Sequence, residues 1–267
     1  MEAFCCYDNV DTMKSSISKK YYIEPDVLLV HKPVGITSFD VVYKLRKILN
    51  IRKIGHAGTL DPLARGLMIV GIGTGTKKLT QYLKLPKTYI AEILVGKSTT
   101  TGDLEGEIVK EEFVGKDDLK KNDIEDYLVK MKGSHTLKVP LYSAIKVQGK
   151  ALYKYAREGK EPPYIPEKEM NILSIQLLDT YHYSEKYQVV QIRIKVSSGS
   201  YIRTLGEEFG KRIGYPATLK GLYRVAIDDY KDSDAYHFKS QNKNSKNIVH
   251  AIIELLRQVR RNICSKK

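Results

Sequence analysis

The sequence contains no tryptophan, only three cysteines and no long hydrophobic run. The longest apolar stretch, at residues 67–72, is far shorter than the roughly 20 residues that a membrane-spanning helix needs. Cys5, Cys6 and Cys264 cannot supply a disulfide framework or a CxxC zinc motif. The first residues include acidic side chains and no apolar run, so we expect no signal peptide. These absences predict a protein of a reducing compartment, by default the cytoplasm, with no membrane-spanning segment and no structural metal.

The chain also has fewer acidic than basic residues. The 267 residues include 45 Lys or Arg and only 31 Asp or Glu, which gives a formal net charge of +14. This excess favours a polyanionic partner, and the charge alone does not choose between nucleic acid and an anionic membrane surface. The 19 tyrosines supply flat rings that can stack on bases, although most of them are expected simply to pack in the fold.

Strand and helix patterns are interspersed along the chain without regular alternation. Residues 27–33 and 89–95 have the apolar and β-branched content of buried strands. Between them, Thr37 or Ser38 is a candidate helix N-cap, with Asp40 in the first turn. Further patterns predict helices at about 122–131, 149–159 and 200–209, a strand at 190–196 and a last amphipathic helix at 248–259. The mixture favours an α+β domain with a mostly antiparallel sheet.

The most unusual segment is KIGHAGTLDPLARG at residues 53–66. Asp61 directly precedes Pro62, and a proline forces the residue before it into an extended conformation, so Asp61 cannot lie in a regular helix. A loop of this kind can hold a carboxylate at the mouth of a site, whereas the commoner alternative for an Asp-Pro pair is a surface turn. A lone histidine such as His56 is more often structural than catalytic.

Other enzyme motifs are incomplete or missing. In GIGTGTKK at residues 71–78, Lys78 stands where a phosphate-binding loop requires Ser or Thr after its lysine. The patterns GxGxxG, HExxH and GxSxG do not occur. No obvious second carboxylate lies near Asp61 to form the acid pair of a glycosidase. We therefore expect no dedicated nucleotide pocket, although Lys77 and Lys78 are candidates for contacts with RNA phosphates.

A series of motifs resembles the TruB family of tRNA pseudouridine synthases. The loop GHAGTLDPLARG resembles the family's signature, and HKPVGITSFDVV at residues 31–42 resembles its KPxGxTS start. The other blocks follow in the family's order: GTKKLTQYL at 75–83, KTY at 87–89, GKSTTTGDLEG at 96–106, PLYSAIKVQGKALYKYAREG at 140–159 and SGSYIRTL at 198–205. The resemblance covers roughly residues 26–228 and implies the pseudouridine synthase fold, a mixed, mostly antiparallel central sheet flanked by helices.

The family's chemistry breaks the bond between C1′ and N1 of a uridine, turns the base and rejoins it through C5. This isomerisation needs no cofactor and no metal. The resemblance implies that Asp61 is the nucleophile or catalytic carboxylate, that Arg203 pairs with it and keeps it ionised, and that Tyr89 stacks on the target base. It implies substrate contacts at His56, at Asp103 through a hydrogen bond to the base edge, and at Leu222, and phosphate or positioning contacts at Lys32 and Lys77.

The implied function is isomerisation of uridine 55 in the T-loop of tRNA, after the base has been flipped out of its stack. We expect the enzyme to be a monomer with tRNA as its partner. Two alternatives stay open: a non-catalytic tRNA-binding folding factor, and a pseudouridine synthase that acts on another RNA.

The expected domain organisation has three parts. Residues 1–25 are expected to form a poorly ordered extension, residues 26–230 the catalytic domain, and residues 231–267 a short basic helical segment. That last segment is too short for the PUA domain that usually follows the catalytic domain in the family. A second departure is GLYRVAI at residues 221–227, which matches the family's pattern only in part.

Overall fold

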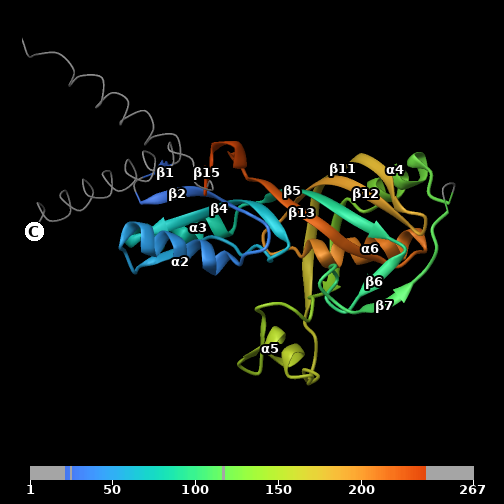
Figure 1. Ribbon diagram of the computed structural model, residues 1–267, viewed down its shortest axis with the longest axis horizontal. Helices are drawn as coiled ribbons and strands as arrows, with labels where there is room; N and C mark the ends of the chain where they lie inside the picture. The colour runs from blue at the N-terminus through green and yellow to red at the C-terminus, as the bar shows by residue number, and fades with distance from the viewer. Residues whose placement is uncertain (1–21, 25, 116–117, 239–267) are drawn as a thin grey trace, which may run out of the picture. The chain divides into compact units, whose positions relative to one another are not determined.

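The computed structural model describes residues 22–24, 26–115 and 118–238. The chain divides into two compact units (Figure 1). Unit 1 combines Met1–Leu85 with Arg224–Lys267, and unit 2 is Pro86–Tyr223. The helix expected at 248–259 lies outside the described residues, as does most of the expected N-terminal extension.

Unit 1 is built on a small sheet in which β2 pairs antiparallel with β4. Strand β1 pairs antiparallel with β2, β3 pairs antiparallel with β4, and β15 pairs parallel with β2. Its strands are β1 (Tyr22–Glu24), β2 (Val27–Lys32), β3 (Ile54–His56), β4 (Ala64–Ile72), β14 (Tyr230–Lys231) and β15 (Tyr236–His237). Its helices are α2 (Ser38–Leu49), η1 (Gly73–Lys78), α3 (Leu79–Leu83) and η2 (Asp232–Asp234).

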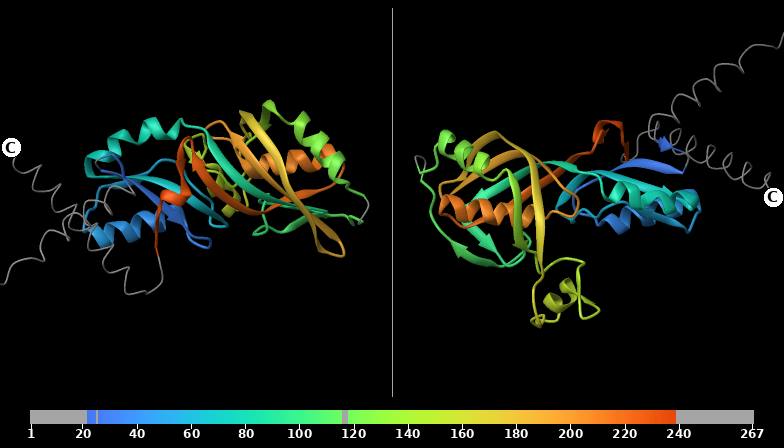
Figure 2. Two further views of the ribbon diagram at one scale, coloured as in Figure 1. Left: turned by 90° about the horizontal axis from the view of Figure 1, so that it is seen from above. Right: turned by 180° about the vertical axis from the view of Figure 1, so that it is seen from behind.

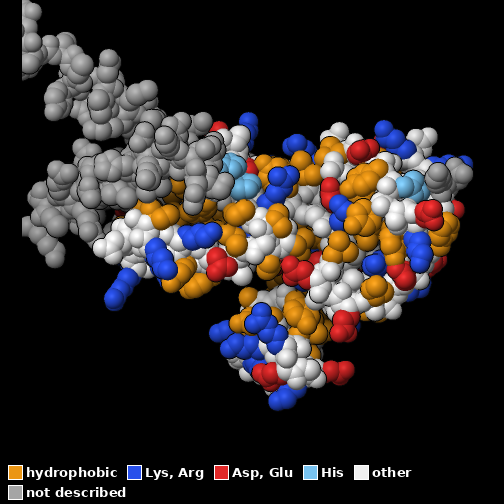
Figure 3. Space-filling view, viewed as in Figure 1, with side chains coloured by type: hydrophobic (Ala, Val, Ile, Leu, Met, Phe, Trp, Pro, Cys, Tyr) orange, Lys and Arg blue, Asp and Glu red, His pale blue; other side chains and the backbone are white. Residues whose placement is uncertain are grey.

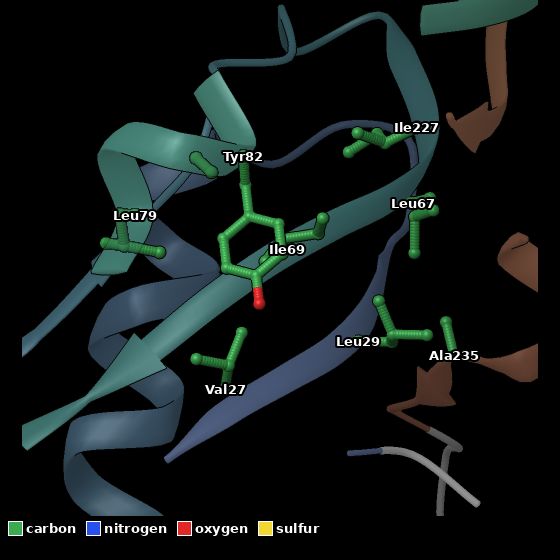
Figure 4. Packing of buried hydrophobic residues seen from close by; sticks show 9 residues of the cluster. Val27, Leu29, Leu67, Ile69, Leu79, Tyr82, Ile227 and Ala235 are labelled. Atoms are coloured by element: carbon green, nitrogen blue, oxygen red, sulfur yellow. The ribbon is translucent and has the colours of Figure 1, made fainter. Parts of the chain in front are cut away.

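One hydrophobic cluster of unit 1 lies between its sheet and α3 (Figure 4). Strands β2 and β4 are buried along almost their whole length, which explains why both are apolar without a polar alternation. Figure 4 shows the Tyr82 ring pointing into this cluster, and its hydroxyl donates to Glu24 Oε1 at 2.6 Å. The labelled members are Val27, Leu29, Leu67, Ile69, Leu79, Tyr82, Ile227 and Ala235.

Unit 2 has a longer antiparallel sheet with the order β5-β12-β11-β8, and both views in Figure 2 show β11 as its long yellow strand. These strands are β5 (Lys87–Val95), β8 (Gly133–Lys138), β11 (Glu167–Ser184) and β12 (Tyr187–Val196). Apolar residues of β5, β11 and β12 line a small cavity together with residues of α6 and with Leu128 and Met131, at the C-terminal end of α4 and just after it. This shared lining shows that α4 (Lys121–Lys130) and α6 (Ile202–Ile213) cover one face of the sheet.

Two hairpins and a strand complete unit 2. One hairpin is β6 (Lys97–Thr99) with β7 (Ile108–Glu111), and the other is β9 (Lys146–Val147) with β10 (Lys150–Ala151), which leads into α5 (Leu152–Arg157). Strand β13 (Ala217–Ile227) begins in unit 2, and its last four residues belong to unit 1.

Most of the local predictions are confirmed. The strands expected at 27–33, 89–95 and 190–196 are β2, β5 and part of β12, and the expected helices near 122–131 and 200–209 are α4 and α6. Thr37 is the N-cap of α2, in a capping box with Asp40. The strand pairs named above are antiparallel apart from β15 on β2, as an α+β fold of this type predicts.

The predicted length of one helix is wrong. The helix expected at 149–159 is confined to Leu152–Arg157, because Lys150 and Ala151 pair with β9 instead of entering the helix. The periodic spacing of tyrosines and alanines does not reveal that a two-residue strand comes first.

Among the described helices, none has the length and apolar character needed to cross a bilayer.

Candidate active site

Asp61 lies in the loop between β3 and β4, half-buried and outside any helix. This placement confirms what the following proline predicts. The loop turns back at once, because the Ala64 amide donates to the Asp61 carbonyl at 3.0 Å and β4 begins there. Asp61 thus stands at the entrance to a strand that is buried along almost its whole length.

The KPxGxTS motif holds this loop from one side. Ser38 Oγ donates to the Leu60 carbonyl at 3.0 Å and accepts from the Leu60 amide at 2.8 Å. The Gly35 amide donates to the Pro62 carbonyl at 2.9 Å. Leu60 and Pro62 flank Asp61, so both neighbours of the carboxylate are fixed by residues of the other motif. Two of the motifs that carry the family resemblance are therefore joined by hydrogen bonds.

Lys32 is fully buried at the end of β2. Its Nζ donates to the carbonyls of Ile36 at 2.7 Å, Pro33 at 2.9 Å and Pro62 at 3.4 Å. A buried ammonium group is costly unless hydrogen bonds satisfy it, and these three carbonyls do so. Between a phosphate contact and a positioning role, this geometry favours positioning of the Asp61 loop.

Arg224 holds the loop from the other side, and sequence reasoning gave it no role. The side chain is 1% exposed, with Nε donating to the Leu67 carbonyl at 2.6 Å and Nη2 to the Gly58 carbonyl at 3.2 Å. Nη1 donates to the Thr59 carbonyl at 3.4 Å. A forked donor that reaches three carbonyls fixes the backbone on both sides of Asp61. The only signal in the sequence was the partial match of GLYRVAI to the family.

His56, in β3, is half-buried and belongs to the same loop system. Burial, and to a smaller extent the charge of Arg224, lowers the pKa of its imidazole. Its Nδ1 is buried without a hydrogen-bond partner among the described residues. A neutral ring suits contact with substrate better than proton transfer as an acid. Lys77 lies in η1 and is exposed, where it can meet phosphates.

In unit 2, Arg203 lies in the first turn of α6 and is 5% exposed. Its Nη1 donates to the Thr101 carbonyl at 2.8 Å and its Nη2 to the Tyr142 carbonyl at 2.9 Å. Its Nε lies 3.8 Å from Asp103 Oδ2. The guanidinium therefore joins three segments of unit 2, so its planar fork has a fixed orientation.

Asp103 is 5% exposed and closes its own turn, because Oδ1 accepts from Thr101 Oγ1 at 2.6 Å and from the Glu105 amide at 3.1 Å. This geometry makes Asp103 a neighbour that orients Arg203. Tyr89 is buried in β5, where it pairs with Ile194 of β12. Leu222 is half-buried in β13.

Glu207 is a second residue without a role in the sequence reasoning. It lies one turn after Arg203 on α6, and burial raises the pKa of its carboxyl. A Cβ on Gly102 would come within 2.8 Å of Glu207 Oε1, so the glycine makes room for this carboxyl. Because Thr101 and Asp103 are the Arg203 partners, Glu207 supports the turn that orients the arginine.

Basic side chains gather over α5 on the face seen in Figure 3. Lys154 and Arg157 of this helix and Lys160 just after it are exposed, and Lys150 lies 4.4 Å from the Tyr155 ring centroid. Such a group of cations and aromatic rings is typical of a surface that meets a nucleic-acid backbone.

Comparison with known proteins gives matches over most of the chain. A model of the TruB family pseudouridylate synthase N-terminal domain matches residues 46–202. A tRNA pseudouridine synthase B of Bacillus velezensis is 41% identical over 213 residues, which covers 80% of this chain and 68% of the relative. A protein of the same name from Endomicrobium trichonymphae is 38% identical over 239 residues, 90% of this chain and 100% of the relative.

Similar solved structures also span most of the described fold. A Cbf5–Nop10–Gar1 complex matches with a TM-score of 0.60 and 24% identity, over 83% of this chain and 54% of that one. An H/ACA RNP bound to a substrate RNA containing 2′-deoxyuridine matches with a TM-score of 0.56 and 22% identity, over 79% and 50%. At these identities the likeness concerns the fold, and it confirms the fold class that the sequence predicts.

Proposed function

The chain belongs to the TruB family of pseudouridylate synthases, and on that premise we propose that it converts uridine 55 in the T-loop of tRNA into pseudouridine. The observation that carries the proposal is the loop of Asp61, whose neighbours are held by Ser38, Lys32 and Arg224. Catalysis gains most from a reactive group whose position is fixed before the substrate arrives. A surface turn, the alternative for an Asp-Pro pair, needs no such support.

Asp61 is the catalytic carboxylate in this proposal. A carboxylate can attack or stabilise the electron-poor C1′ of the ribose when the bond to N1 breaks, and it can leave again when C5 forms the new bond. The proton on C5 is lost to solvent and the ring nitrogen N1 gains one, so the reaction is balanced without a cofactor.

Arg203 and Tyr89 have supporting roles. As the family resemblance implies, the guanidinium of Arg203 is the charged partner of the Asp61 carboxylate in this proposal. Tyr89 stacks on the base while it turns. His56 and Leu222 contact the flipped nucleotide, and Lys77 and the basic side chains around α5 meet phosphates. Lys32 and Asp103 position the catalytic loop and the arginine, as their hydrogen bonds suggest.

The partner in this proposal is tRNA, and residues 26–230 form the catalytic part. A net charge of +14 supports an RNA partner. We further propose that the enzyme works in the cytoplasm as a monomer.

The experiment maps the product. The full chain is incubated with an unmodified tRNA transcript, and pseudouridine is located by carbodiimide labelling and reverse transcription. We expect one stop, at position 55, and no stop on a transcript that carries cytidine at position 55. A stop at another position, or on another RNA only, would favour the alternative substrate. Tight tRNA binding with no stop would favour the folding factor.

A further inference from the structure

Two histidines and an aspartate gather in unit 1 on elements that take no part in the proposed chemistry. His31 lies in β2, Asp232 in η2 and His237 in β15. One ring nitrogen or carboxylate oxygen from each residue lies within 4.8 Å of those of the other two.

The fold brings these residues together through strand register. Strand β15 pairs parallel with β2, and its two residues face Val30 and His31, so that His237 is the cross-strand partner of His31. Cross-strand partners point to the same face of a sheet, and the two imidazole rings stack with centroids 4.2 Å apart. Asp232 begins η2, the single turn that precedes β15. Two short elements, η2 and β15, thus hold Asp232 and His237 beside His31 of β2.

The carboxylate is the least exposed of the three groups. The Asp232 side chain is 3% exposed, and its oxygens lie 2.8 and 3.0 Å from His31 Nδ1. A buried carboxylate is costly unless a charge or a hydrogen-bond donor compensates it, and His31 provides one such partner. His237 is exposed, which leaves the site accessible from solvent.

We propose that His31, Asp232 and His237 bind one divalent transition-metal ion of the zinc class. Imidazole nitrogen and carboxylate oxygen are the ligands that Zn²⁺, Co²⁺ and Ni²⁺ accept together, whereas Mg²⁺ and Ca²⁺ prefer oxygen alone. Three protein ligands leave the fourth position of a tetrahedral ion to water. On binding, the ion takes the place of the hydrogen between His31 Nδ1 and Asp232, and the neutral imidazole that coordinates through Nδ1 carries its one proton on Nε2.

Binding requires a small rearrangement. Ligand atoms of a tetrahedral zinc ion stand about 3.3 Å apart, so a cluster that spans up to 4.8 Å must contract. A metal ion also lies near the plane of each imidazole, and the two rings are parallel within 13°. His237 is the ring that must turn, since it is exposed, while Asp232 keeps His31 in place.

The ion would fasten β15 to β2. His31 directly precedes Lys32, whose ammonium group holds the carbonyl of Pro62. A metal on His31 would therefore stabilise unit 1 and the strand that supports the Asp61 loop. It would take no part in the isomerisation, so this inference does not depend on the proposed function.

The test uses the full, tag-free chain with Cys5, Cys6 and Cys264 changed to serine, because thiolates compete for zinc. Co²⁺ is titrated and its visible spectrum recorded, and the thermal midpoint is measured with and without Zn²⁺. The variants are His237→Gln and Asp232→Asn, and the matched control is His182→Gln, an exposed histidine of β11.

We expect one Co²⁺ per chain with the intense visible bands of a tetrahedral site, and a thermal midpoint that rises with Zn²⁺. His237→Gln should weaken binding by at least about tenfold, whereas His182→Gln should leave it unchanged. The proposal is overturned if Zn²⁺ does not move the midpoint, or if His237→Gln and His182→Gln bind equally well. If Asp232→Asn lowers the midpoint of the metal-free chain, His237→Gln still decides, because its side chain is exposed.

Discussion

Ser38 and Leu60 exchange two hydrogen bonds, in which one hydroxyl serves both the amide and the carbonyl of a residue 22 positions further along the chain. The pair is buried, and it joins the first residue of α2 to the loop that presents Asp61. In this way a helix start controls the position of a carboxylate to which it is not adjacent in sequence.

Ser38→Ala should therefore affect both stability and turnover. The change leaves the Leu60 amide and carbonyl buried without their hydroxyl partner, which costs roughly 1–3 kcal/mol of unfolding free energy. Turnover should fall more than apparent tRNA affinity, because the loop is displaced and the RNA-binding surface is kept. Urea unfolding and single-turnover kinetics measure the two effects. Ser174→Ala, in an exposed position of β11, is the control and should match the wild type.

Arg224→Lys tests whether the Asp61 loop needs the planar guanidinium of Arg224 as well as its positive charge. Lysine keeps the cation, but it cannot reach the carbonyls of Gly58, Thr59 and Leu67 in the planar arrangement of a guanidinium. We expect a lower rate of pseudouridine formation and a loss of about 1.5–3 kcal/mol in stability. Arg193→Lys, at an exposed position of β12, should leave both quantities unchanged. A normal rate in Arg224→Lys would show that the loop does not need this residue.

Lys32→Met and Lys77→Met should have different effects on stability and on tRNA binding. Lys32→Met leaves three carbonyls without their buried donor and should lower stability in urea unfolding. Lys77→Met removes an exposed cation and should leave stability unchanged while it weakens tRNA binding. The slope of log affinity against log salt concentration is negative. If Lys77 contacts a phosphate, this slope should become shallower by about 1 in Lys77→Met. An unchanged slope would remove Lys77 from the RNA contacts.

Glu207→Gln should change the pH dependence of stability. Burial raises the pKa of this carboxyl, so the folded state holds its proton more tightly than the unfolded chain does. The stabilisation is present below the unfolded-state pKa and is lost as the pH rises through the folded-state pKa. Because glutamine stays neutral, the variant should gain stability relative to the wild type as the pH rises from the unfolded-state pKa of the carboxyl to its higher folded-state pKa. Glu185→Gln, in an exposed turn, should show no such gain.

Local features of the fold were predictable from the sequence because they depend on neighbours along the chain. Thr37 and Asp40 form a capping box within four residues, and Asp61 lies outside any helix, as expected for a residue that Pro62 follows. The helix at 149–159 was predicted too long, since its first residues pair with a strand that the periodicity does not reveal.

The contacts that build the candidate site could not be predicted in the same way. Arg224 reaches Thr59 across 165 positions, and Asp232 reaches His31 across 201. Such contacts depend on strand register, which composition and spacing do not specify. A scan for cysteine motifs therefore predicts no metal, whereas the histidines of β2 and β15 become neighbours only when the strands pair.

The most direct test of the account is release of tritium from C5 of uridine in tRNA under single-turnover conditions, since forming the new bond at C5 must expel that hydrogen. The wild type and Asp229→Asn, an exposed aspartate of unit 1, are compared with Asp61→Asn. We expect release by the first two and none above background by Asp61→Asn, which should still bind tRNA. Release by Asp61→Asn at the rate of Asp229→Asn would contradict the assignment of Asp61 as the catalytic carboxylate.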